Sequence, residues 1–459
     1  MSQPAQASLT RLEEIVGGAH VLTDPPDLSA RQVDGMCPSV VVRPADAAEI
    51  AEIVRFAAAE KLALIPCGGC TKLGIGSPPA RYDIALDVTR MNRVLAYDPH
   101  DLTLGVEPGA RIEDLLQVLA EQKQFLPIAV PFSDRATVGG IVAANSSSPL
   151  RHSYGGVRDF CLGMEFVTGE GAAAKSGGRV VKNVTGYDLH KLLIGSLGTL
   201  AVITRVNFRT FPLLPAHGTF VASFSEAEAA FGFCGAIAHS VLTPQVVEVA
   251  DPGAAHLVFS AETPVRITAQ QWSVVITAAG QPTVVDRHAH ELGHMASAAS
   301  ADEFVQLSDE EHSSILARIR EFPRLVLEAA PSAMIFRIDV LPTSMAPLLT
   351  RLGQLAAQNR LDFAALTRAA GIMYAAFLGE DGDASPFAAL AKVSGDVFQT
   401  CGNSEINAQA MLERSPTEVK RAAGGVWGPS RQDVALMQRV KNAFDPQSVL
   451  SPGRFAGGI

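Results

Sequence analysis

A short glycine-rich segment that follows an apolar run near residue 65 holds residue types that could bind a phosphate. Backbone N–H groups in such a turn can cradle an anion, the hydroxyl of Thr71 can donate, and Lys72 adds positive charge. Neither a P-loop nor a dinucleotide fingerprint is present, because Gly-x4-Gly-Lys-Ser/Thr is absent and Ser77-Pro78 follows Gly76. An ordinary glycine turn is the alternative. The candidate binding residues are Pro66, Gly68, Gly69, Cys70, Thr71, Lys72 and Leu73.

A second stretch, from Pro131 to Thr204, is also rich in glycine and small residues. Few long side chains lie near its glycines, so the backbone could approach a large flat ligand closely. Thr137-Val138-Gly139-Gly140 opens a helix-like segment that runs to Asn145. Tyr154 could be an ordinary half-buried aromatic residue. Together the two stretches suggest one extended phosphate-bearing cofactor held at two places.

Cys67 and Cys70 form a single Cys-x-x-Cys motif in the first segment. A structural zinc ion needs four ligands, and no second pair of this kind exists in the chain. A redox pair is one interpretation, because cysteines of low pKa occur beside cations such as Lys72. The other is that both are small residues tolerated in a tight loop. Six cysteines in so long a chain do not indicate a disulfide framework, so reduced thiols are expected.

The run His290-Glu291-Leu292-Gly293-His294 matches the His-Glu-x-x-His pattern of zinc hydrolases. On a helix it would place two imidazoles on one face, with Glu291 as base and Glu310 or Glu311 as a third ligand. Gly293 would cost such a helix about 1 kcal/mol relative to alanine. A solvated histidine-rich helix or loop is the plainer interpretation, and no metal site is predicted.

The composition is that of a globular protein with a sizeable core. The chain has 459 residues, of which 47% are hydrophobic and 18% charged, enough for two or three domains. A formal net charge of −10 argues against nucleic acid as the main partner. No apolar run approaches the roughly 20 residues of a membrane span, and the first residues lack a hydrophobic signal core. A cytoplasmic location is therefore expected.

Alternating strands and helices must position the two glycine-rich segments. Ile50, Ile53, Val54 and Ala57 share one helical face, and the strand over 62–65 runs directly into the first glycine loop. The other early elements are a helix over 9–16, strands over 39–42, 84–88 and 102–106, a helix over 112–119 and a strand over 200–208.

Prolines at 212 and 215 mark a boundary, after which glycine motifs become rare. Expected strands in this later region are 246–249, 272–277, 334–340 and 373–377. Ser430 and Asp433 resemble a capping box that opens a helix ending near Phe444. The predicted division is a lead over 1–34, two lobes over about 35–107 and 108–215, a cap over 216–420, and a C-terminal segment over 421–459.

Taken together, these segments resemble the flavin-binding fold of the vanillyl-alcohol oxidase and p-cresol methylhydroxylase superfamily. The first loop matches at Pro66 to Thr71, with Cys70 in place of a third glycine. The other matching segments are Thr137–Gly140, Tyr154-Gly155, Gly198–Thr204 and Phe444–Arg454. The resemblance implies an α+β fold of two α/β lobes, an α+β cap and a C-terminal segment that returns to the flavin.

The same resemblance implies FAD as the cofactor and extends the first loop to a full binding site. The residues that it adds are Pro131, Thr137, Val138, Gly139, Gly140, Asn145, Tyr154, Gly155, Val202 and Ile203.

Within the superfamily the chain is similar to the smaller FAD-binding subunit of bacterial glycolate oxidase complexes. The similar phrases are Val33–Pro38, Gly177–Leu189 and Trp427–Pro429. This implies glycolate or another small 2-hydroxy acid as substrate and two protein partners, a larger FAD-containing subunit and an iron–sulfur subunit. It also implies a cytoplasmic protein that could attach peripherally to the inner membrane through the complex.

Catalytic relatives resemble one another in a cap motif, His-x-Gly-Asp-Gly-Asn-x-His, followed later by Glu-His. This chain has Gly379-Glu380-Asp381-Gly382-Asp383 in that place without flanking histidines, and its last histidine is His312. A base-plus-metal site is therefore not expected, and no catalytic residue is assigned. A self-sufficient FAD-dependent D-2-hydroxy-acid dehydrogenase is the alternative function, and a zinc hydrolase using His290, Glu291 and His294 is a remote one.

Overall fold

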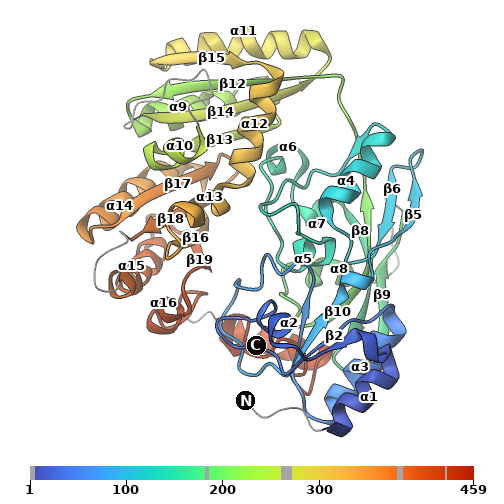
Figure 1. The fold of residues 1–459 in the computed structure, drawn as a ribbon. Coiled ribbons are helices and arrows are strands. Elements are labelled where there is room, and N and C mark those ends of the chain that lie inside the picture. The colour runs from blue at the N-terminus through green and yellow to red at the C-terminus, as the bar shows by residue number, and fades with distance from the viewer. Residues whose placement is uncertain (1–5, 181–185, 260–270, 380–385, 430–431) are drawn as a thin grey trace. The chain divides into compact units, whose positions relative to one another are not determined.

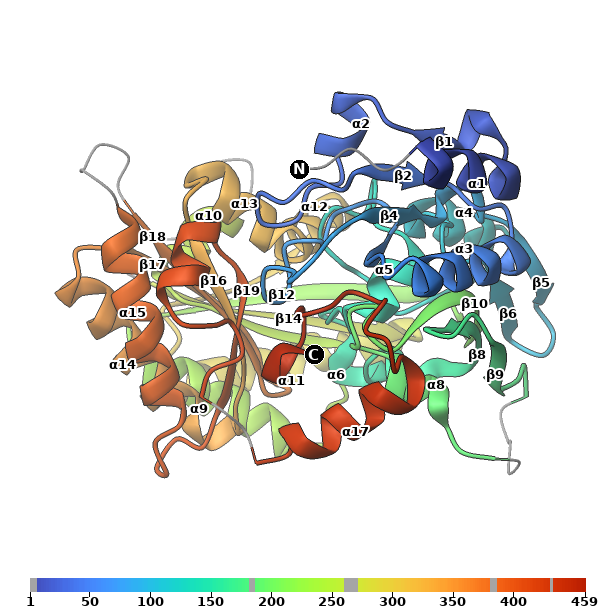
Figure 2. The ribbon, with the colours of Figure 1, turned by 90° about the horizontal axis from the view of Figure 1, so that it is seen from below.

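A computed structural model describes residues 6–180, 186–259, 271–379, 386–429 and 432–459 of the chain. The chain forms two compact units, each built from helices and strands (Figures 1 and 2), which confirms the α+β class. Unit 1 consists of Met1–Ser147, Gly156–Leu213 and Pro429–Ile459. Unit 2 consists of Ser148–Gly155 and Leu214–Gly428. No pattern in the sequence indicates that residues 148–155 belong to unit 2.

The first sheet of unit 1 has the strand order β1-β2-β4-β3. The pairings β2–β4 and β3–β4 are parallel, whereas β1–β2 is antiparallel. Its strands are β1 Val21–Leu22, β2 Val40–Val42, β3 Leu64–Cys67 and β4 Ile84–Asp87. Helix α3 (Ala47–Ala59) connects β2 to β3, as the sequence predicted. Because β3 ends at Cys67, the glycine loop begins at the carboxyl end of a buried parallel strand, where such sheets commonly bind ligands.

Helix α3 forms where a capping residue precedes an amphipathic pattern. The side chain of Asp46 accepts hydrogen bonds from the N–H groups of Ala48 and Glu49, at 2.8 and 2.9 Å. The predicted apolar face is buried against the sheet. Helix α1 (Gln6–Val16) packs on α3 and buries Leu12 and Val16.

The second sheet of unit 1 has the order β5-β6-β10-β8-β9 and is antiparallel throughout. Strand β6, which was expected in the first lobe, pairs with β10, and Leu104 lies opposite Phe208. Because the two strands are far apart in the chain, no local sequence pattern indicates that they pair. Its strands are β5 Val94–Asp98, β6 Thr103–Val106, β8 Cys161–Thr168, β9 Ala173–Gly177 and β10 Ala201–Arg209. The helices that share its core are α4 Ile112–Glu121, α5 Val138–Ala143, α7 Val157–Phe160 and α8 Leu189–Leu193.

The C-terminal segment returns to unit 1 beside β3. Leu64 donates its N–H to the carbonyl of Val449 at 2.8 Å and accepts from the N–H of Ser451 at 2.9 Å. Helix α17 (Val434–Phe444) precedes this contact and ends where predicted. Its N-cap residue is Asp433, so the expected capping box with Asp433 at the third position is wrong; Ser430 lies outside the described residues.

Unit 2 contains an eight-stranded antiparallel sheet with the order β15-β12-β14-β13-β17-β18-β16-β19. All four strands predicted in this region are present. The strands are β12 Ala216–Phe224, β13 Val246–Ala250, β14 Trp272–Gly280, β15 Glu303–Leu307, β16 Met334–Asp339, β17 Asp362–Arg368, β18 Ile372–Leu378 and β19 Gln409–Arg414.

Helices cover both faces of this sheet, since alternate strand residues belong to different cores. Val247 and Val249 pack with the helices of one face, whereas Ala250 packs with those of the other. The first face carries α9 Ala227–Ala238, α11 Pro282–Ala298, α14 Met345–Gln358 and α15 Pro386–Cys401. The second face carries α10 Pro252–Val258, α12 Asp309–Arg320 and α13 Phe322–Ala329.

The remaining elements are short. They are η1 Gly18–His20, α2 Pro25–Ser29, η2 Val88–Arg90, β7 Gln124–Phe125, α6 Arg151–Tyr154, β11 Phe211–Pro212, η3 Pro342–Ser344, α16 Thr417–Ala422 and η4 Ala456–Gly458. Among the described residues, none of the helices has both the length and the apolar character that a membrane crossing requires.

Candidate functional site

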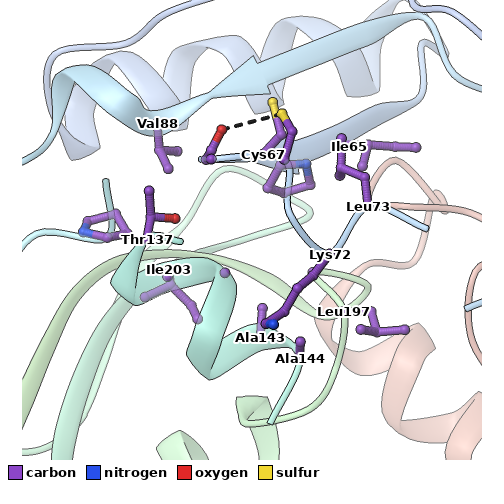
Figure 3. Close-up of a pocket in the computed structure, with 18 of the residues that line it drawn as sticks. Ile65, Cys67, Lys72, Leu73, Val88, Thr137, Ala143, Ala144, Leu197 and Ile203 are labelled. Atoms are coloured by element: carbon purple, nitrogen blue, oxygen red, sulfur yellow. Dashed lines mark hydrogen bonds between the residues drawn. The ribbon is translucent and has the colours of Figure 1, made fainter. Parts of the chain in front are cut away.

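A cavity of unit 1 opens at the carboxyl end of β3, and the first glycine-rich segment forms one of its walls (Figure 3). Lys72 extends from this wall across the cavity toward Ala143 and Ala144. Every residue predicted for this segment lines the cavity: Pro66, Gly68, Gly69, Cys70, Thr71, Lys72 and Leu73.

Residues from the second stretch form the facing wall. Helix α5 contributes Gly139 and Gly140, Thr137 precedes that helix, and β10 contributes Val202 and Ile203. The structure therefore brings together two segments far apart in the chain, as a cofactor held at two places would require.

Three other predicted residues of unit 1 do not line the cavity. The side chain of Val138 belongs to the core of the second sheet, and its N–H donates to the carbonyl of Ala110 at 2.9 Å. Pro131 is partly buried in the segment that precedes α5. Asn145 has a left-handed backbone (φ 46°) and packs against Gly195.

Tyr154 and Gly155 belong to unit 2 rather than to the unit that holds the cavity. The hydroxyl of Tyr154 accepts a hydrogen bond from Nε2 of Gln245 at 2.9 Å, and helix α6 contacts β13. Gly155 ends α6 with φ 74°, which glycine adopts readily. Their local role is thus to hold the 148–155 segment on unit 2.

The glycines of the first loop are required by the protein itself. A Cβ at Gly68 would lie 2.2 Å from Oγ1 of Thr137, and one at Gly69 would lie 1.7 Å from the carbonyl oxygen of Arg135. Both positions therefore need glycine so that the loop can pack against residues 135–137. The tight packing joins the two walls of the cavity.

Gly140 is different, because its missing side chain faces open space. Among the described residues, a Cβ at Gly140 would meet a single atom within 4 Å, Oγ1 of Thr137 at 3.4 Å. Gly140 also lines the cavity. Close approach of a ligand is therefore a physical reason for glycine here, whereas packing explains Gly68 and Gly69.

Donor groups in the cavity suit a ligand that carries acceptors. The hydroxyl of Thr137 is buried and has no hydrogen-bond partner among the described residues. A buried unpaired hydroxyl costs free energy unless a ligand or water satisfies it. Lys72 adds a positive charge on the opposite wall. This donor set fits the phosphates of an extended cofactor.

Arg454 completes the cavity from the C-terminal segment and was missing from the predicted site. Its guanidinium donates to the carbonyl of Leu73 at 2.6 Å and to that of Ile75, and lies 4.0 Å from the Asp34 carboxylate. It therefore fixes the end of the glycine loop. The sequence could have indicated this residue, because Arg454 is the last residue of the Phe444–Arg454 segment that resembles the superfamily.

The other lining residues that sequence reasoning missed are mostly small or apolar. Several of them, such as Ile65 and Ala201, follow the pattern of buried strands, so their types indicate a core and carry no separate signal for a cavity. These residues are Ile65, Cys67, Val88, Pro108, Ala143, Ala144, Leu197, Gly198 and Ala201.

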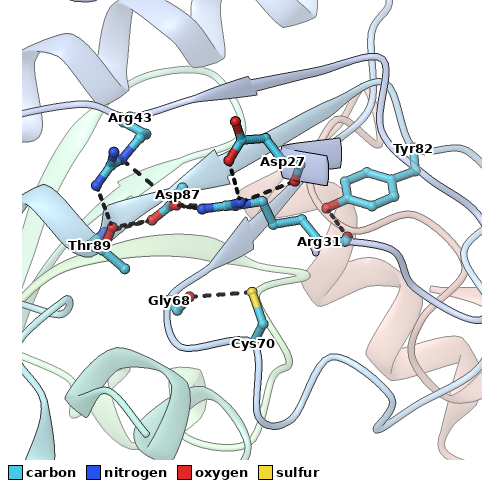
Figure 4. A network of polar contacts seen from close by, with 8 residues as sticks. All are labelled: Asp27, Arg31, Arg43, Gly68, Cys70, Tyr82, Asp87 and Thr89. Atoms are coloured by element: carbon cyan, nitrogen blue, oxygen red, sulfur yellow. Dashed lines mark hydrogen bonds and ion pairs between the residues drawn. The ribbon is translucent and has the colours of Figure 1, made fainter. Parts of the chain in front are cut away.

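A network of charges holds the N-terminal segment over the end of the first sheet (Figure 4). Arg31 binds the carboxylate of Asp87 at 2.8 Å, and Asp87 also accepts from the hydroxyl of Thr89 at 2.6 Å. Tyr82 donates its hydroxyl to the carbonyl of Arg31 at 2.9 Å. Asp87 ends β4 directly beside Cys67 of β3, so this network lies next to the start of the glycine loop.

Unit 2 contains a buried ion pair in its sheet. The guanidinium of Arg368 lies 3.2 Å from the carboxylate of Glu248 and 4.8 Å from the centre of the Tyr374 ring. Burial raises the pKa of Glu248 to about 7, and the positive charge of Arg368 opposes that rise. Sequence reasoning did not single out these residues.

The zinc-hydrolase pattern lies on helix α11, which continues through Gly293. The rings of His290 and His294 lie 4.5 Å apart, but Glu291 pairs with Arg287 at 2.6 Å instead of acting with them. No three histidine, cysteine, aspartate or glutamate side chains in the described part of the chain are placed to hold a metal ion. The Gly379–Asp383 phrase lies outside the described residues from Glu380 onward.

Comparison with known protein families matches residues 38–177 to an FAD binding domain. Residues 215–386 and 429–455 match the C-terminal domain of FAD linked oxidases. The chain belongs to the FAD-linked oxidases. FAD is its cofactor, as predicted, and the protein is an oxidoreductase.

Named relatives of this FAD-linked oxidase agree with the predicted resemblance to glycolate oxidase subunits. The glycolate oxidase subunit GlcD of Bacillus subtilis is 23% identical over 91% of this chain and 88% of its own length. The subunit GlcE of Escherichia coli is 36% identical over 35% of this chain and 46% of its own. A D-2-hydroxyglutarate dehydrogenase of Stutzerimonas stutzeri is 31% identical, over 46% of each chain. The chain thus spans about half the length of the last two proteins.

Solved structures with the same fold include p-cresol methylhydroxylase and a 4-ethylphenol oxidase. p-Cresol methylhydroxylase superposes with a TM-score of 0.76 at 16% identity, covering 98% of this chain and 96% of its own. The 4-ethylphenol oxidase from Gulosibacter chungangensis gives 0.76 at 18% identity over the same shares. The fold expected from the sequence is confirmed.

Proposed function

We propose that this FAD-linked oxidase is the FAD-binding subunit of a glycolate oxidase-type complex. In this proposal the complex oxidises glycolate to glyoxylate and passes the electrons to a partner iron–sulfur subunit. The observation that carries the cofactor site is the buried hydroxyl of Thr137, which has no partner in the described part of the chain and lies beside the open face of Gly140. The relatives named as glycolate oxidase subunits support the substrate class.

The residues that would hold FAD come from both walls of the cavity. Gly140 would let the cofactor approach the backbone, Thr137 would donate its hydroxyl, and Lys72 would neutralise phosphate charge. Ile65 and Val202 would supply apolar surface that keeps water away from the flat parts of the cofactor. When bound, FAD supplies the acceptor for the hydride of the hydroxy acid.

The proposal of a partner subunit rests on which proton-accepting side chains this chain contains. Oxidising an alcohol to a carbonyl requires a group that takes the hydroxyl proton, commonly a histidine. The sequence contains no histidine after His312, so none follows the strand β18 that precedes the 379–383 phrase. We therefore assign the substrate-activating base to the larger subunit of the complex. Residence in the cytoplasm, with attachment to the inner membrane through that complex, completes the proposal.

Anaerobic flavin reduction tests the assignment. The purified chain should be yellow, with FAD absorption near 450 nm, and this band should persist when glycolate is added. Addition of the larger subunit should bleach it, and addition of the iron–sulfur subunit with an excess of an artificial electron acceptor should restore it as electrons leave. A colourless chain that cannot be reconstituted with FAD would refute the cofactor site, and bleaching by glycolate alone would refute the need for a partner.

A self-sufficient D-2-hydroxy-acid dehydrogenase is the second candidate, and the buried ion pair of unit 2 favours it. A guanidinium such as that of Arg368 suits a substrate carboxylate, and Glu248 could take a proton, since burial raises its pKa to about 7. The D-2-hydroxyglutarate dehydrogenase relatives point the same way. Bleaching of the isolated chain by D-2-hydroxyglutarate or D-lactate, lost in Glu248→Gln, would select this candidate.

A further inference from the structure

Two thiols lie side by side in the loop that lines the FAD cavity. Cys67 ends β3 and is buried, while Cys70 is partly exposed three residues later. Only Gly68 and Gly69 separate the two cysteines, and both cysteines line the FAD cavity. As a thiol, Cys70 also donates to the carbonyl of Gly68 at 3.4 Å (Figure 4). Two cysteines that share one tight loop meet the first requirement of a disulfide, which is proximity in the fold.

Cys70 is the more reactive of the two thiols. The hydrogen bond from Cys67 lowers the pKa of Cys70, and Arg31 and Arg135 act in the same direction, against burial and Asp87. The same hydrogen bond and burial raise the pKa of Cys67. The pair therefore has the asymmetry of an attacking thiolate and a resolving thiol.

Three other cysteines lack these properties. Cys161, Cys234 and Cys401 are buried singly, and burial raises the pKa of each thiol to about 12. Cys70, in contrast, lines the FAD cavity and also a second cavity of about 760 Å³ on the other side of the loop. A small reactant can therefore reach Cys70 without passing through the cofactor's space.

We propose that Cys67 and Cys70 form a reversible disulfide by exchange with low-molecular-weight disulfides, and that its formation weakens FAD binding. The effect on FAD rests on the proposed cofactor site, whereas the disulfide itself does not.

The exchange balances in two steps. The Cys70 thiolate attacks one sulfur of the small disulfide, whose S–S bond breaks and releases one thiolate. Cys67 gives its proton to solvent and attacks the mixed disulfide on Cys70, so that the Cys67–Cys70 bond forms and the second thiolate leaves. The two cysteines lose two electrons and two protons, and the small disulfide gains both as two thiols.

The loop offers little room for this change on its packed side. Gly68 and Gly69, between the two cysteines, press against Thr137 and the carbonyl of Arg135 so closely that neither place has space for a Cβ. Cys70 itself has a left-handed backbone, with φ 56°, which L side chains seldom adopt. Closing the disulfide must shift these residues, and the shift is passed to Thr137 on the opposite wall of the cavity.

Differential alkylation of the FAD-loaded protein tests the proposal. The protein is equilibrated in glutathione buffers from fully reduced to fully oxidised, free thiols are capped, disulfides are reduced, and the new thiols receive a second label for mass spectrometry. Cys67 and Cys70 should change label together, and the intact protein should lose two hydrogen atoms. Cys37→Ser should behave like the wild type, and Cys70→Ser should leave Cys67 unbridged.

Gel filtration in the same buffers measures retained FAD, which should fall at least about tenfold when the pair is oxidised, equivalent to about 1.4 kcal/mol in binding. The proposal is overturned if both thiols keep the first label throughout, or if oxidation stops at a glutathione adduct on Cys70. Unchanged FAD retention in the bridged form also overturns it. Failure of the reduced protein to bind FAD would instead refute the proposed cofactor site.

Discussion

Lys441 donates a hydrogen bond to the carboxylate of Asp445 across 2.6 Å, and both side chains are almost fully shielded from solvent. The same ammonium group also donates to the carbonyls of Thr199 and Leu450, at 2.7 and 2.9 Å. Asp445 in turn accepts from the N–H of Val449 at 3.0 Å. All three ammonium protons are thus used to tie α17 and the C-terminal segment to the strand region that enters β10.

Replacing Lys441 with methionine should destabilise unit 1 by about 3–5 kcal/mol, because it leaves the Asp445 carboxylate buried without a counter-charge. Urea unfolding followed by circular dichroism measures this. Combining Lys441→Met with Asp445→Asn should cost less than the sum of the two single changes. The control is Lys191→Met, since Lys191 pairs with Asp188 at the surface and its loss should cost below about 1 kcal/mol. Equal losses for both lysines would contradict the prediction.

Gly140→Val should leave the protein folded but impair FAD binding, because the added methyl groups would extend into open cavity space. FAD content after gel filtration is the measurement, and we expect a loss of at least about tenfold in affinity, equivalent to about 1.4 kcal/mol. Gly69→Ala is the matched comparison. It should instead lower the melting temperature or prevent folding, since its Cβ would overlap the Arg135 carbonyl. Normal FAD content in Gly140→Val would remove Gly140 from the site.

Thr137→Val should bind FAD about tenfold more weakly without loss of stability. Its hydroxyl is buried and unpartnered among the described residues, so a methyl group of the same size should be neutral or stabilising for the protein without FAD. Thr199→Val is the control, because the Thr199 hydroxyl donates to Ser196 at 2.7 Å and its loss should cost about 1 kcal/mol. Fluorescence titration with FAD and thermal melts separate the two effects. A large stability loss in Thr137→Val would show that its hydroxyl has a partner within the protein.

The sequence predicted those parts of the site whose residue types, within a short segment, indicate ligand binding. The Pro66–Leu73 loop stands out because glycines, a hydroxyl and a lysine follow an apolar strand. Tyr154 shows the limit, since its aromatic type is visible but its place in unit 2 depends on a hydrogen bond to Gln245, 91 residues away. Likewise, the sequence predicted β6 and β10 as separate strands, whereas it did not predict their pairing, because register over long separations is set by packing.

The ion pair between Glu248 and Arg368 should make stability depend on pH. Burial raises the pKa of Glu248 from 4.5 to about 7, so the folded protein holds a proton that the unfolded chain has lost between these values. The free energy of unfolding should therefore fall as pH rises from about 5 to 7 and then level off. Glu248→Gln cannot titrate, so wild type should lose about 2–3 kcal/mol relative to it between pH 5 and 8.

Urea unfolding of both proteins at each pH gives that difference directly. Asp251, whose pKa burial also raises to about 7, contributes equally to both proteins and cancels. Glu113→Gln, at an exposed position of α4, measures the effect of the substitution itself. A difference between wild type and Glu248→Gln that stays constant with pH would contradict the assignment.

Replacing both His290 and His294 with alanine should alter neither FAD content nor flavin reduction. Both side chains lie on the exposed face of α11, where substitutions usually change stability by less than about 0.5 kcal/mol. Elemental analysis of the purified protein should find zinc well below one equivalent. Stoichiometric zinc that the double variant loses would revive the hydrolase interpretation.

Unit 1 is discontinuous, since residues 214–428 come between its second and third segments. During translation, the ribosome therefore synthesises the whole sheet of unit 2 before α17, Lys441 and Arg454. Until then β3 lacks the neighbouring backbone of Val449 and Ser451, and the glycine loop lacks the guanidinium that binds Leu73. Cofactor loading should thus be the last event in biogenesis, and a nascent chain stalled before residue 434 should expose an incomplete site that chaperones must shelter.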